Sequence, residues 1–127
     1  MTINEAITAA DGLRNNSIPE AIKIRWLSEL DGRIYTEIIK PYQKDETSTV
    51  PKYDESTPAD TELIVPHPYD GLYLAYLEME IARQNAELPR YNNAAIVFNE
   101  KFSAFKRWYN RNNTKLSAFI KFPTRWL

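Results

Sequence analysis

The fold is decided by residues 17–41, which read SIPEAIKIRWLSELDGRIYTEIIKP. Apolar side chains recur every four positions along this stretch, and this spacing predicts an amphipathic helix. They are Ile22, Trp26, Leu30, Ile34 and Ile38, widened by Leu27, Tyr35 and Ile39. Ser17 and Glu20 form a capping-box pattern with Pro19 in the first turn, and Pro41 ends the run. We therefore expect one long helix to supply the main buried stripe.

Three further helices are predicted around this one. The first begins at the capping pair Thr2 and Glu5 and ends near Gly12. The third runs over about residues 69–87, and the fourth begins after Pro89 and ends near residues 111–113. Trp26 on the long helix and three rings of the fourth helix fall on apolar stripes, so we assign them to the core: Phe98, Phe102 and Phe105. The fold class is thus mainly α, a bundle of about four helices.

A long acidic connection, residues 42–66, separates the second and third helices. It holds six acidic and two basic side chains, with few apolar anchors. Connections beyond about 12–15 residues are uncommon in compact domains unless they are functional or disordered. Because residues 49–53 and 62–65 could pair, we expect a β-hairpin arm here, with an open loop as the alternative.

Composition excludes several kinds of chemistry. The chain has 127 residues, no cysteine and one histidine, His67, so thiolate sites and two-histidine metal sites cannot form. Its three glycines are scattered, which excludes a phosphate-binding glycine-rich loop. Glu78 and Glu80 stand two apart on a helix and point in different directions, so they do not form an acid/base pair. We expect a non-enzymatic protein with no metal or cofactor.

Other features of the chain bear on its location and backbone. The N-terminus lacks the pattern of a signal peptide, and nowhere do eighteen apolar residues run together. We therefore expect a protein that is neither secreted nor membrane-spanning. Gly32 inside the long helix costs about 1 kcal/mol relative to alanine, and close packing, a slight bend or no special role would each account for it.

Charge is distributed unevenly along the chain. Residues 101–127 hold seven basic and no acidic side chains, although the whole chain has a net charge of −1. We divide the chain into a helical domain, 1–110, and an extended basic, aromatic C-terminal arm, 111–127. Such an arm can dock on another protein, bind phosphates and stack bases, or be an ordinary helix surface with a frayed terminus.

Three tyrosines of the third helix cover a wider arc than one core contact requires, which leaves core and subunit interface open for them. Together with the arm they make up the predicted interface: Tyr69, Tyr73, Tyr76, Arg107, Arg111, Lys115, Phe119, Lys121, Phe122, Arg125 and Trp126.

Four stretches carry a resemblance to a known family. They are MTINEAI at 1–7, KIRWLSELDGRIY at 23–35, ELIVPHPYD at 62–70 followed by Leu72-Tyr73, and RYNN at 90–93. The sequence resembles small head-tail connector, or adaptor, proteins encoded by tailed phages and prophages of Gram-positive bacteria. The resemblance extends to about Tyr109 and includes no catalytic residue.

The resemblance implies a helical subunit that assembles as a ring beneath the portal, joins the head to the tail and lines the path of the DNA. Implied partners are further copies of the chain, the portal and tail-completion proteins, with non-specific contact to DNA and no membrane. We expect it in the virion and, during assembly, in the cytoplasm of the bacterial host. The rival hypothesis is a small nucleic-acid-binding or DNA-packaging accessory protein that uses the basic C-terminal segment.

Overall fold

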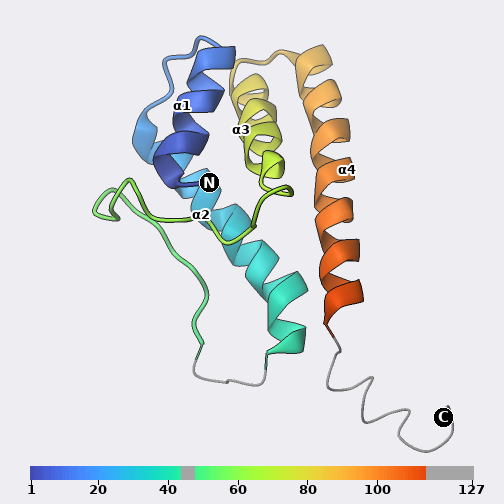
Figure 1. The fold of residues 1–127 in the computed structure, drawn as a ribbon. Coiled ribbons are helices and arrows are strands. Elements are labelled where there is room, and N and C mark those ends of the chain that lie inside the picture. Colours follow the sequence, from blue (N-terminus) through green and yellow to red (C-terminus); the bar gives the residue numbers. More distant parts are fainter. Residues whose placement is uncertain (44–47, 114–127) are drawn as a thin grey trace, which may run out of the picture.

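The computed structural model describes residues 1–43 and 48–113 and shows a bundle of four helices with one long loop (Figure 1). The helices are α1 (Ile3–Leu13), α2 (Glu20–Ile34), α3 (Gly71–Gln84) and α4 (Leu88–Asn112). A π-helical turn, η1 (Tyr35–Ile39), and a 3₁₀ turn, η2 (Lys40–Tyr42), extend α2. The prediction of a mainly helical bundle is confirmed.

The two predicted capping boxes have different outcomes. At α1 the Thr2 hydroxyl accepts a hydrogen bond from the Glu5 amide at 3.1 Å, and the Glu5 carboxylate accepts one from the Thr2 amide at 2.9 Å. At α2 the box is wrong, because the helix begins at Glu20 and no side chain caps it. Ser17 lies outside the helix, and Pro19 occupies the cap position instead.

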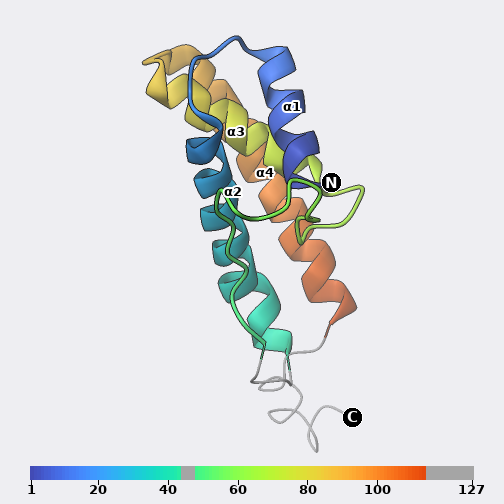
Figure 2. The same cartoon turned by 90° about the vertical axis from the view of Figure 1, so that its left-hand side faces the viewer.

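The helix α3 occupies the middle of the bundle (Figures 1 and 2). It packs against α4 on one side and against α1 on the other, while α2 crosses behind. α4 packs mainly along α3 and meets η1 near one end, so much of its surface faces outward. None of the helices in the described part of the chain is long and apolar enough to cross a lipid bilayer.

The predicted aromatic core residues are buried. Trp26 is 5% exposed, and the three rings of α4 face α3 with exposures of 9% or less: Phe98, Phe102 and Phe105. The Arg33 guanidinium carbon lies 4.7 Å above the centre of the Phe102 ring, which adds a cation–π contact at the edge of the core. These buried residues therefore belong to the core, and contacts with other molecules must be made by exposed side chains.

The long connection is a loop, so the predicted β-hairpin is wrong. Residues 48–70 contain no strand, and the one bridge in this region joins Glu62 to Thr2. The loop pairs with the N-terminal segment through three backbone hydrogen bonds. The Ile3 amide donates to the Thr61 carbonyl at 3.0 Å, the Asn4 amide to the Ala59 carbonyl at 3.0 Å, and the Leu63 amide to the Met1 carbonyl at 2.9 Å. The pattern of apolar side chains predicts extended backbone at residues 62–65. It does not determine which other segment of the chain supplies the hydrogen-bond partner.

Gly32 lies against this loop. A Cβ atom at Gly32 would be 3.4 Å from Val50 Cγ1 and 3.9 Å from the Pro51 carbonyl oxygen, which is ordinary van der Waals contact. Close packing is thus present at Gly32, but it does not require glycine.

Candidate functional site

A single buried carboxylate, Asp31, joins the long loop to the bundle. Its side chain is completely buried. One carboxylate oxygen accepts hydrogen bonds from the Tyr53 hydroxyl at 2.6 Å and the Ile64 amide at 3.2 Å. The other accepts a bond from the Tyr73 hydroxyl at 2.6 Å. Because Tyr53 and Ile64 belong to the loop and Tyr73 to α3, three segments meet at one side chain.

The electrostatics of this network favour a structural role. Burial raises the pKa of Asp31, and the hydrogen bonds from Tyr53, Tyr73 and Ile64 act in the opposite direction. All three partners are donors, which suits a carboxylate that only accepts. Burial and the neighbouring Asp31 raise the pKa of both tyrosines well above the usual range, so their hydroxyls stay protonated. The Tyr73 hydroxyl also accepts a bond from the Val65 amide at 2.9 Å, which saturates the network.

A second buried charge joins α1 to α2. Lys23 is 3% exposed, and its ammonium nitrogen lies 2.7 Å from the Asp11 carboxylate. The Asn16 side chain donates to the same oxygen at 3.1 Å. Partial burial would raise the pKa of Asp11, but the hydrogen bonds from Lys23 and Asn16 outweigh it and lower the pKa. The pair fixes the end of α1 against the first turns of α2.

The structure separates the three tyrosines predicted at an interface. Tyr73 is completely buried and bound to Asp31, so its assignment to an interface is corrected to the core. Its hydroxyl finds a buried acceptor there, which lets a tyrosine occupy a core position. Tyr69 is half-buried, with its ring 5.2 Å from that of Trp108. Tyr76 is also half-buried, and burial raises its pKa to about 12.

The C-terminal half of α4 carries four exposed basic side chains, which we call the basic face. They are Lys101, Lys106, Arg107 and Arg111. None of the four forms an ion pair with a carboxylate within the described residues. Arg107 and Arg111 were predicted at the interface, and both are exposed. The other predicted residues of the arm lie outside the described residues: Lys115, Phe119, Lys121, Phe122, Arg125 and Trp126.

Rings cluster beside this basic face and join η2 to α4. The Tyr42 hydroxyl donates to the Asn110 side chain at 2.6 Å, and the Tyr42 ring lies edge-on to that of Tyr109 at 5.3 Å. Trp108 stacks near Phe105 at 6.0 Å. The prediction from sequence missed Trp108, although it stands three residues beyond the core residue Phe105 and so shares its side of the helix.

Two surface hollows of the described residues adjoin α4. One lies between α3 and α4 and includes Arg14, Glu78 and Arg90. The other, of about 440 Å³, lies at the α3–α4 turn and includes Leu88 and Tyr91. The residues that line them include no Ser, Cys, Thr, Lys or His, which are common nucleophiles and bases in covalent catalysis. Across residues 1–43 and 48–113, no group of three or more His, Cys, Asp or Glu side chains is placed to hold a metal ion.

His67 and the two helical glutamates take part in different contacts. His67 is exposed just before α3, with its imidazole 3.7 Å from the Asp70 carboxylate. Glu80 pairs with Arg83 at 2.6 Å, whereas Glu78 belongs to the hollow between α3 and α4. The two carboxylates therefore do not share a site.

Comparisons with known proteins add no relative. No protein-family model, no curated protein and no solved structure matches this chain.

Proposed function

We propose that this chain is a non-enzymatic structural protein of a tailed phage or prophage, a head-tail connector subunit that assembles beneath the portal. The phage identity rests on the resemblance of residues 1–7, 23–35, 62–70 and 90–93 to that family. The observation that supports an assembly role is the acidic loop, which is tied to the core by Asp31 and keeps its charged side chains exposed.

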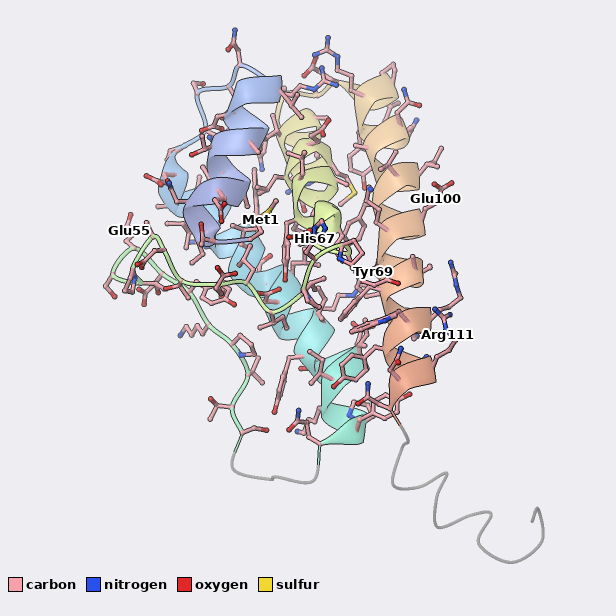
Figure 3. The ribbon with its side chains drawn as sticks, in the orientation of Figure 1. Met1, Glu55, His67, Tyr69, Glu100 and Arg111 are labelled. Carbon is pink, nitrogen blue, oxygen red and sulfur yellow. The ribbon has the colours of Figure 1, made fainter. Side chains whose placement is uncertain are left out.

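Residues of the resembling stretches meet in the structure. Asp31 belongs to the stretch 23–35, Ile64 to the stretch 62–70, and Tyr73 follows directly. The residues that carry the resemblance thus build the fold and position the loop. Contacts to partners are then made by exposed residues of the loop, such as Glu55, and by α4 (Figure 3).

Ordering a long loop costs conformational entropy, so an ordered loop must be held by specific stabilising contacts. Fixing the backbone of one residue costs about 1–2 kcal/mol of conformational entropy. The chain offsets this cost with a saturated buried carboxylate and with core contacts from Tyr53, Leu63 and Val65. An ordered loop that exposes charged side chains is typical of a binding element on a rigid scaffold.

The proposal is tested by mixing the purified full-length chain with the portal complex encoded in the same gene cluster. We expect the two to sediment together and to show an added ring under the portal in electron micrographs. The same chain should be found by mass spectrometry in purified particles. A chain that neither binds the portal nor occurs in particles would exclude the connector role.

A second function is favoured by the unpaired basic side chains of α4. Phosphates of a nucleic acid would be held by such a face, with further basic residues in the predicted arm. A fluorescence titration with duplex DNA at several salt concentrations tests this alternative. Binding that weakens steeply with salt would support it, and lack of binding at low salt would exclude it.

A further inference from the structure

Two segments of the described residues carry opposite charges. Residues 48–70 contain five acidic side chains and one basic one, and residues 101–113 contain four basic side chains and no acidic one. The side chains of the loop thus sum to −4 with His67 neutral, of which Glu62 and Asp70 pair with the Met1 ammonium, and those at the end of α4 sum to +4. The two segments lie on opposite sides of the molecule, as the positions of Glu55 and Arg111 show (Figure 3).

The acidic side of the loop consists of Asp54, Glu55 and Asp60, and we call it the acidic loop face. All three residues are exposed. Hydrogen bonds from Ser56 and Thr57 lower the pKa of Asp54. No Lys or Arg of the described residues forms an ion pair with any of the three. Their charges are therefore available to another molecule.

Both faces also present apolar surface for contact. Pro58 and Ala59 are exposed between the acidic side chains of the loop. Beside the basic face, the half-buried ring of Trp108 packs near the rings of Tyr69 and Phe105. An interface with charged groups at its edge and an aromatic side chain in its interior is common between proteins.

A second copy of the chain fits the basic face better than a nucleic acid does. Outside residues 101–113, the described residues contain eight basic and fifteen acidic side chains. A DNA duplex on α4 would meet repulsion from this acidic body, which acts over about 8 Å at physiological salt. Each further copy of the chain, in contrast, supplies one acidic loop face for each basic face.

We propose that the acidic loop face of one copy binds the basic face of α4 on the next copy. This inference rests on the proposed assembly function and names the contact through which copies associate. Because the faces lie on opposite sides of the molecule, the acidic loop face of one chain cannot bind the basic face of the same chain. When two copies bind, one copy keeps a free acidic loop face and the other keeps a free basic face. Such a head-to-tail contact is heterologous and closes a ring or extends a filament.

Sedimentation of the full-length chain at increasing concentration tests the contact. We expect self-association at about 10 mM salt and its loss near 1 M salt, where the Debye length falls from about 30 Å to about 3 Å. The loop variant E55K/D60K changes the charge of the acidic loop face from −3 to +1, and the helix variant R107E/R111E changes the charge of the basic face from +4 to 0. Each alone should weaken association by at least about tenfold, because the attraction between the two faces is lost in the helix variant and becomes repulsion in the loop variant.

An equimolar mixture of the two variants should form pairs again, because the unchanged basic face of the loop variant then meets the unchanged acidic loop face of the helix variant. A control variant, R25E/K40E, makes the same change in net charge as R107E/R111E at exposed residues of α2 and η2 and should behave like the parent chain. Circular dichroism confirms that each variant is folded.

Two results would overturn the contact. One is a parent chain that stays monomeric at low salt and high concentration. The other is an R107E/R111E variant that loses DNA binding but keeps self-association, which would assign the basic face to phosphate. Failure of the contact leaves the portal-binding test unaffected, so the two proposals are judged separately.

Discussion

Replacing Asp31 with alanine tests how the loop is held. The substitution leaves three donors without an acceptor: the hydroxyls of Tyr53 and Tyr73 and the amide of Ile64. Each buried donor left unpaired costs about 1–3 kcal/mol, whereas the desolvation cost of the carboxylate is recovered. Because Ile64 is only half-buried and its amide can reach water, we expect the free energy of unfolding to fall by about 3–5 kcal/mol.

Urea unfolding followed by tryptophan fluorescence measures this loss, since Trp26 is buried in the parent chain. Trypsin should also cut more rapidly at Lys52 in the Asp31→Ala variant, because the loop has lost its anchor. Glu29→Ala, an exposed substitution on the same helix, is the control and should change stability by less than about 0.5 kcal/mol. A loss below about 1 kcal/mol with unchanged cutting at Lys52 would refute the anchoring role of Asp31.

Further predictions concern charge and backbone. Asp11→Ala should cost about 2–3 kcal/mol in urea unfolding, because it leaves the buried Lys23 unpaired, whereas Lys23→Met should cost under about 1 kcal/mol; equal losses would contradict this. The raised pKa of Asp31 means that the folded chain binds this proton more tightly than the unfolded chain. The stability of the parent should therefore fall relative to Asp31→Asn as the pH rises above about 4 in parallel unfolding series, and a constant difference would argue against the shift. Gly32→Ala should raise stability by about 0.5–1 kcal/mol in a thermal melt, because the new Cβ meets Val50 at ordinary contact distance; a lower melting temperature would show that the contact is too tight.

The helices could be predicted from sequence because their signals are local. The capping pair of Thr2 and Glu5 and the four-residue spacing along α2 act within one or two turns. Pro89 likewise marks the first turn of α4. These signals do not depend on the rest of the chain, so they survive without knowledge of the tertiary structure.

The network around Asp31 could not be predicted in this way, because its partners are 22, 33 and 42 residues distant. An acidic residue in a helix is usually solvated, and only the position of Asp31 four residues after the buried Leu27 hinted at burial. Tyr73 was ambiguous for the same reason, since its acceptor was unknown. The path of the loop was wrongly predicted because its pairing partner is the N-terminus.

The packing of α4 on α3 has a consequence for the order of folding. The two helices are joined by a short turn, so little loop-closure entropy opposes their contact, and this hairpin should form early. The bonds to Asp31 require the loop to close over segments far apart in the sequence, so they should form after the hairpin. Nascent chains would then expose an unattached acidic loop, and a copy would become competent for partners only after its last buried hydrogen bonds had formed.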